Sequence, residues 1–112
     1  MKKYVISLGG SLINSPGINL AYLRAIRRIF LQEVKKGAQL YIVVGGGQPA
    51  RDYQKAARRI ATTADADLDW VGIAATKLNA ELVRAIFGKL AFPRVISDPS
   101  RKVPGLKKIN IF

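Results

Sequence analysis

The sequence predicts an α/β fold with a mainly parallel sheet, and three observations lead to this expectation. Two short apolar runs, YVISL at 4–8 and QLYIVV at 39–44, are rich in β-branched residues, and glycines end each of them. Such runs are typical of buried strands. A helical pattern lies between them, and a strand, a helix and a second strand in so short a stretch form a βαβ unit, in which the strands run parallel.

A loop is predicted from Ser11 to Asn19, and the helix between the two strands is predicted from residue 20 onward. Its apolar residues recur at helical spacing, and arginines occupy the opposite side. Asn19 is suited to cap the amino end of this helix, and Gly37 is suited to the left-handed position just after its carboxyl end. The expected buried positions are Leu23, Ile26, Ile29, Phe30 and Val34.

Two further helices are predicted after the second strand. Pro49 suits the first turn of one, and a second, from Asp69 to Phe87, should end at Gly88. The apolar face expected for the first comprises Tyr53, Ala56, Ala57 and Ile60, and that for the second comprises Val71, Ala74, Ala75, Leu78, Leu82 and Ile86. Residues 94–97 and 108–112 are expected to add strands, and the chain ends inside this last apolar run.

Composition narrows the possible functions. The chain has 112 residues, enough for one small domain, and contains neither cysteine nor histidine, which excludes disulfides, thiol chemistry and imidazole catalysis. A net charge of +12 favours anionic partners, although solvated helix faces account for many of these charges. No run reaches the ~20 apolar residues of a membrane helix, and a cytoplasmic location is expected.

The first candidate site is the turn Gly9-Gly10-Ser11, here called the first glycine turn. Glycines at the end of a strand let the backbone turn and present its N–H groups to an anion, and Ser11 adds a hydroxyl donor. The alternative is a tight turn without a ligand.

The second candidate site is Gly45-Gly46-Gly47, here called the second glycine turn. It leads into the amino end of a helix, where free N–H groups and the helix dipole favour anions. Arg51 lies in the first turns of that helix and can bind the same anion with two hydrogen bonds. A flexible loop with a surface arginine is the alternative.

The two glycine turns together predict more than either alone. Both follow parallel strands, so they lie at the same carboxyl edge of the sheet, where open α/β sheets bind ligands. Two neighbouring phosphate sites suggest two substrates and phosphoryl transfer between them. Neither turn has the spacing of a Walker A loop or of a dinucleotide-binding loop.

Polar residues near the third predicted helix leave two interpretations open. Asp65, Asp67 and Asp69 suit the start of a helix, and Asp69 could also accept hydrogen bonds from sugar hydroxyls. They do not match a calcium loop, and no protein metal site is expected. Thr76 and Asn79 share one helix face, where they either make core hydrogen bonds or contact a ligand.

These motifs resemble the archaeal-type uridylate kinases of the amino acid kinase superfamily. The resemblance rests on VISLGGSLI, IVVGGGQPARDY and LDWVGIAATKLNAELV in this order, and it runs from about residue 3 to residue 112. It implies a three-layer α/β/α sandwich that transfers a phosphoryl group from ATP, with Mg²⁺ on the nucleotide phosphates, to UMP. It also implies that residues 1–112 are the amino-terminal, UMP-binding part and that an ATP-binding half is absent from this sequence.

The resemblance assigns roles to the candidate residues. Gly9, Gly10 and Ser11 would contact ATP phosphates, and Gly45 and Gly46 would face UMP. Gly47 and Arg51 would lie at the phosphates between the substrates, which makes Arg51 the candidate catalytic residue. The remaining UMP-binding candidates are Asp69 at the ribose, Thr76 and Asn79.

The resemblance also has departures and rivals. Many superfamily members carry a catalytic lysine where this sequence has Ser7; the archaeal-type branch often lacks it, and a cationic catalyst is then not identified. Family members form homo-oligomers, often hexamers. Rival interpretations are a related phosphotransferase acting on carbamate, an acylated amino acid or another phosphate, and a basic RNA-binding module, although stacking aromatics are few.

Overall fold

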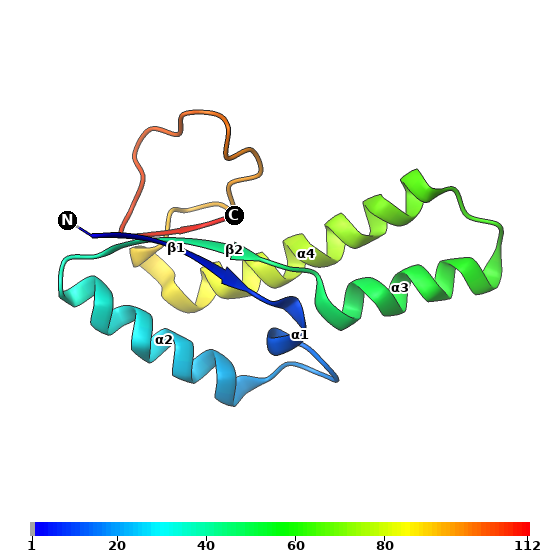
Figure 1. The fold of residues 1–112 in the computed structure, drawn as a ribbon, viewed down its shortest axis with the longest axis horizontal. Helices are drawn as coiled ribbons and strands as arrows, with labels where there is room; N and C mark the ends of the chain where they lie inside the picture. Colours follow the sequence, from blue (N-terminus) through cyan, green and yellow to red (C-terminus); the bar gives the residue numbers. More distant parts are fainter. Residues whose placement is uncertain (1) are drawn as a thin grey trace.

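The computed structural model describes residues 2–112 and contains a three-stranded parallel sheet (Figure 1). Its strands, β1 (Lys3–Leu8), β2 (Gln39–Val44) and β3 (Ile109–Ile111), lie in the order β1-β2-β3. In the register, Leu8 pairs with Val44 and Leu40 pairs with Ile109. The expected α/β class with parallel strands is confirmed.

One face of the sheet carries the core, which α2 (Leu20–Lys35) and α4 (Asp65–Phe87) cover. Phe30 of α2 stacks on Phe87 of α4 with ring centroids 6.1 Å apart, so the two helices meet beneath the strands. The strands contribute every second side chain to this core, as their alternation requires. The core comprises Leu8, Ile13, Leu23, Ile26, Phe30, Ala38, Leu40, Ile42, Val44, Ala80, Val83, Phe87, Ala91, Ile109 and Ile111.

Both ends of α2 agree with the prediction. The Asn19 side chain accepts a hydrogen bond from the backbone N–H of Tyr22 at 3.0 Å and so caps the helix. At the other end Gly37 has φ +96°, and its N–H and that of Ala38 donate to the carbonyls of Val34 and Glu33. This is a Schellman termination, which favours glycine at the left-handed position.

The helical hairpin of α3 (Gly47–Ile60) and α4 extends beyond the carboxyl edge of the sheet (Figure 1). Consequently no residue of α3 is buried, and the prediction of a buried apolar face on α3 is wrong. Tyr53 and Ile60 are 68% and 86% exposed, because most of α3 lies beside α4 alone, beyond the sheet.

The prediction for α4 is correct at its carboxyl end, at Phe87 and Gly88, and wrong at its start. The helix begins at Asp65, with Asp65 and Asp67 in its first turn, where negative charge is favourable. Its buried stripe also differs from the predicted one: Leu78 is 70% exposed, whereas Asn79 and Val83 are buried. The stripe consists of Leu68, Ala75, Asn79, Ala80, Val83 and Phe87.

Two shorter predictions are also corrected. Residues 10–13 form one helical turn, α1 (Gly10–Ile13), where a loop was expected. After η1 (Gly88–Leu90), residues 94–97 form no strand. The chain runs beside β3 there, and only the N–H groups of Phe92 and Ile96 donate to it, to the carbonyls of Ile109 and Ile111. Pro93 between them has no N–H to donate.

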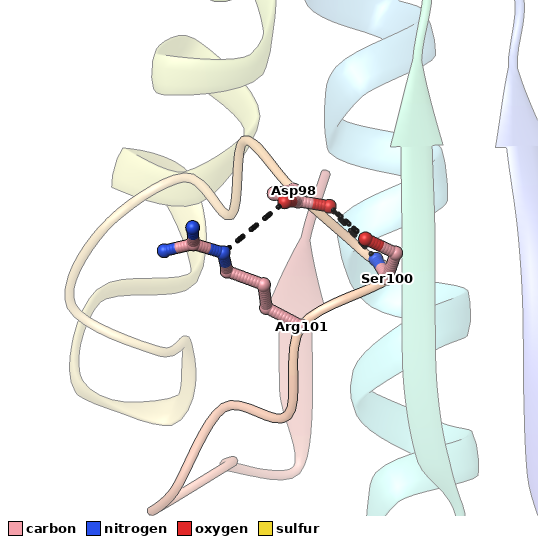
Figure 2. A network of polar contacts seen from close by, with 3 residues as sticks. All are labelled: Asp98, Ser100 and Arg101. Atoms are coloured by element: carbon pink, nitrogen blue, oxygen red, sulfur yellow. Dashed lines mark hydrogen bonds and ion pairs between the residues drawn. The ribbon is translucent and has the colours of Figure 1, made fainter.

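The other face of the sheet is covered by a loop rather than by a helix (Figure 1). Val5 is 79% exposed and Val43 is 43% exposed on this face. Within the loop, Asp98 accepts hydrogen bonds from the backbone N–H and hydroxyl of Ser100 and pairs with Arg101 at 3.6 Å (Figure 2). These hydrogen bonds lower the pKa of the Asp98 carboxyl, the Ser100 hydroxyl contributing most.

Candidate functional site

The two glycine turns meet backbone to backbone at the carboxyl edge of the sheet. A Cβ atom on Gly10 would collide with the backbone nitrogen of Gly47 and with the carbonyl of Gly45. A Cβ atom on Gly47 would collide with the carbonyl of Gly10, and Gly47 also has φ +63°, a conformation that side chains disfavour. This close approach explains why both turns need glycine, independently of any ligand.

Arg51 connects the second turn to the first. Its Nη2 atom donates to the hydroxyl oxygen of Ser11 at 3.0 Å and to Oε1 of Gln48 at 3.1 Å. Ser11 belongs to α1 and Arg51 to α3, so this contact spans 40 residues of sequence. The first glycine turn, the second glycine turn and Arg51 are therefore one cluster, as the sequence predicted.

The charge of Arg51 is not neutralised by a carboxylate. Ion pairs join Lys36 to Glu33, Arg84 to Glu81 and Arg101 to Asp98, whereas Arg51 forms none with residues 2–112. The nearest acid on α3, Asp52, instead accepts a hydrogen bond from Gln48. Both oxygens that Arg51 contacts are uncharged, so the cluster keeps a net positive charge that an anion can use.

A hollow of about 500 Å³ opens beside this cluster, between α3 and α4. Asp69 on α4 lines the same hollow as the second glycine turn and Arg51. Five of the residues predicted from sequence line this hollow: Gly46, Gly47, Arg51, Asp69 and Thr76. Gly9, Gly10 and Ser11 do not line it and lie on the far side of the contact between the two turns.

Thr76 and Asn79 make internal hydrogen bonds, which is one of the two interpretations left open by the sequence. The Thr76 hydroxyl donates to the carbonyl of Gly72 at 3.0 Å, one helical turn earlier, and Thr76 still lines the hollow. Asn79 is only 4% exposed, and its side-chain nitrogen lies 3.0 Å from the carbonyls of both Gly45 and Gly46. Asn79 thus lies beneath the second glycine turn rather than in the hollow.

Sequence reasoning missed Gln54, which holds the two helices together at the hollow. Its Nε2 atom donates to the carbonyl of Leu68 at 2.9 Å. A Cβ atom on Gly72 would lie 2.9 Å from the same nitrogen, so a larger residue there would displace the end of the Gln54 side chain. Gln54 follows Arg51 by three residues and therefore shares its helix face, which was a usable signal.

A second hollow of about 420 Å³ adjoins the first, and Ile73 and Thr76 line both. Its other walls are mainly apolar side chains of α4, of the segment that runs beside β3, and of Phe112. Its lining residues are Ile73, Thr76, Lys77, Ala80, Glu81, Val95, Ile96, Ser97 and Phe112.

Residues 2–112 contain neither a cluster of metal ligands nor a membrane-spanning helix. This part of the chain contains no group of three or more acidic, histidine or cysteine side chains that is placed to hold a metal ion. None of its helices has both the length and the apolar character to cross a membrane.

Comparison with known proteins agrees with this geometry. A sequence profile described as the amino acid kinase family matches residues 2–109. The chain belongs to the amino acid kinase family. This confirms the family-level resemblance found in the glycine turns and in the pattern around Asp69, Thr76 and Asn79.

Several archaeal uridylate kinases are similar to this chain. The uridylate kinase of Methanoregula boonei is 37% identical over 99% of this chain and 47% of its own length, and that of Methanothermobacter thermautotrophicus is 40% identical over 83% and 40%. A crystal structure of uridylate kinase from Archaeoglobus fulgidus superposes with a TM-score of 0.78 at 32% identity, covering 99% of this chain and 49% of the other. The chain thus spans about half the length of the relatives it matches.

Proposed function

We propose that these residues form the acceptor-binding part of a nucleoside monophosphate kinase that phosphorylates UMP to UDP with ATP. The observation that carries this proposal is the single cluster of two glycine turns and an unneutralised Arg51, beside an open hollow that Asp69 lines. The relatives named uridylate kinase support it. UDP formation would place the activity in pyrimidine nucleotide synthesis in the cytoplasm.

In this proposal the two turns hold the phosphates that react. The first glycine turn and Ser11 bind ATP phosphates, and the second glycine turn binds the UMP phosphate. Arg51 lies between the turns, where it attracts both anions and stabilises charge on the transferred group. A UMP phosphate oxygen attacks the γ-phosphorus of ATP, the bond from that phosphorus to the ADP oxygen breaks, and the products are UDP and ADP.

The two adjoining hollows suit the nucleoside of the acceptor. Asp69 offers carboxylate oxygens to the ribose hydroxyls, and the apolar walls of the second hollow, among them Ile96 and Phe112, suit the face of a base. Mg²⁺ would enter on the phosphates of ATP, since no acidic cluster of residues 2–112 is placed to hold it, and it would neutralise phosphate charge.

The remaining parts of the proposal concern the rest of the molecule. We propose that residues 1–112 correspond to the amino-terminal half of the kinase domain and that the ATP base is bound by a half outside this sequence, because the relatives are about twice as long as the matched region. Homo-oligomerisation is also proposed. Leu20 and Ile29 of α2 are 57% and 48% exposed and would supply apolar contacts to a second copy.

The test is a titration of the isotope-labelled chain with UMP, followed by NMR. Arg51→Gln should weaken UMP binding about tenfold or more, because a charge-assisted contact to phosphate is lost. Arg58→Gln removes an exposed charge on the same helix away from the hollow and should change the affinity less than about twofold. Equal losses in both variants would overturn the proposal, as would salt-dependent RNA binding without UMP binding.

A further inference from the structure

We infer that Asn79 is a positioning residue: it holds the second glycine turn so that the N–H groups of Gly46 and Gly47 both face the hollow, ready for a phosphate oxyanion. The inference rests on the proposed function for the identity of the phosphate. The orientation of the turn does not depend on the proposed function, because it follows from hydrogen bonds within the chain.

The first step is the pair of hydrogen bonds that Asn79 donates. Its side-chain nitrogen lies 3.0 Å from the carbonyl of Gly45 and 3.0 Å from that of Gly46. A primary amide has two N–H hydrogens, one for each carbonyl. Because Asn79 is 4% exposed and sits on a helix of the core, these two carbonyls are fixed toward the inside of the domain.

The second step is the geometry of the peptide bond. In a trans peptide the carbonyl and the following N–H point in opposite directions. The carbonyl of Gly45 faces Asn79, so the N–H of Gly46 points away from Asn79, and the carbonyl of Gly46 likewise directs the N–H of Gly47 away from Asn79. Gly46 and Gly47 both line the hollow, and Asn79 does not.

The third step is that these donors are free within residues 2–112. Neither the N–H of Gly46 nor that of Gly47 donates to another group of the described chain. Gly46 immediately precedes α3 and Gly47 is its first residue, and the first N–H groups of a helix have no partner within the helix. Two adjacent outward N–H groups at a helix start, with Arg51 one helical turn further on, form a concave site for a phosphate oxygen.

Asparagine is the residue that this arrangement requires. An aspartate of the same shape would present oxygens to two carbonyl oxygens, and a leucine would leave both carbonyls without a partner. The donor nitrogen of Asn79 is committed to the turn, so its effect on UMP would be transmitted through Gly46 and Gly47. Asn79, which the resemblance made a candidate for direct contact with UMP, therefore acts on the ligand indirectly.

The experiment compares Asn79→Ala with Val83→Ala. Val83 is fully buried one helical turn further along α4, so its truncation destabilises the same helix without touching the turn. Inorganic phosphate and UMP are the probes, and the backbone amide signals of Gly46 and Gly47 are followed by NMR. The carbonyl carbon shifts of Gly45 and Gly46 report the two hydrogen bonds without any ligand.

We expect Asn79→Ala to shift both carbonyl signals and to weaken binding of phosphate and UMP about tenfold, while Val83→Ala keeps wild-type affinity. The inference is overturned if Asn79→Ala binds both probes as the wild type does, if Val83→Ala loses affinity equally, or if the wild type binds neither probe. Wild-type binding of phosphate at Gly46 and Gly47 without binding of UMP would overturn the proposed acceptor and leave the role of Asn79 standing.

Discussion

At the scale of single residues, the glycines of the two turns have unequal importance. Gly10 is packed against the backbone of the second glycine turn, whereas a Cβ atom on Gly9 would meet only the side chain of Leu12 at 3.9 Å. Because backbone atoms cannot move aside cheaply, the space around Gly10 is closed to any side chain. The same sequence motif thus contains one glycine that is indispensable and one that is replaceable.

The matched pair Gly10→Ala and Gly9→Ala tests this difference. Gly10→Ala should lower the free energy of unfolding by about 1–3 kcal/mol, since the added methyl group forces the two turns apart. Gly9→Ala should change it by less than about 0.5 kcal/mol. Urea unfolding followed by circular dichroism measures both, and equal destabilisation would contradict the packing described above.

The amino end of α2 offers a second test at the residue scale. Asn19→Ala removes the oxygen that accepts from the N–H of Tyr22, and it should cost about 1 kcal/mol of stability. Asn19→Asp keeps a capping oxygen and should recover most of the loss. If the alanine and aspartate variants melt together, the cap contributes nothing to stability.

At the scale of elements, the loop that crosses the outer face of the sheet has its own organisation. Ser100 and Arg101 surround the carboxylate of Asp98 (Figure 2). The hydrogen bonds from Ser100 favour the charged form and lower the pKa of Asp98 below its ordinary value of 3.8. The stability that these hydrogen bonds give the loop is therefore fully present at pH values above the ordinary pKa of Asp98. It is lost as the pH falls through the lowered pKa of Asp98.

An NMR titration of the Asp98 carboxyl carbon checks this expectation. In the wild type its midpoint should lie below 3.8, and Ser100→Ala should move the midpoint upward, because the largest stabilising contact of the carboxylate is removed. Ser97→Ala is the matched control, since Ser97 makes no hydrogen bond to Asp98. A midpoint that is unchanged in Ser100→Ala would contradict the assignment.

The helices show how an element's surroundings decide whether a sequence pattern is buried. Most of the pattern on α2 is buried because α2 lies on the sheet: Leu23, Ile26 and Phe30 are buried. The expectation that Ile29 is buried is wrong, because its side chain lies outside this stripe and is 48% exposed. The pattern on α3 is not buried, because α3 lies beyond the sheet edge and leaves Tyr53 and Ile60 exposed. Periodicity identifies a helix and its apolar side, but it does not identify what will cover that side.

At the scale of the whole molecule, the outer sheet face is an apolar surface that its loop covers only in part. Parallel sheets are ordinarily covered on both faces. Here Val5, Tyr41, Val43, Pro99 and Phe112 line a hollow of about 260 Å³, and the chain spans about half the length of its relatives. We expect a polypeptide equivalent to the rest of a relative to cover this face.

This leads to a prediction for the whole molecule. The 112-residue chain alone should show no substantial UMP-dependent release of ADP. Co-expression with the second half of the Archaeoglobus fulgidus uridylate kinase should give a co-purifying complex with activity and with less binding of a hydrophobic dye. Val5→Asp should prevent this assembly, whereas Lys55→Asp on the exposed side of α3 should not. Kinase rates from the chain alone would contradict the prediction.

The sequence by itself determined the parallel strands, the capped helix between them and the grouping of the two glycine turns with Arg51. These depend on local patterns and on the rule that parallel strands end at one sheet edge. The tertiary structure alone decided that Gly10 packs on Gly47, that Asn79 lies under the second turn, and that Gln54 joins two helices. Such contacts join residues far apart in sequence, and no local periodicity encodes the distance between them.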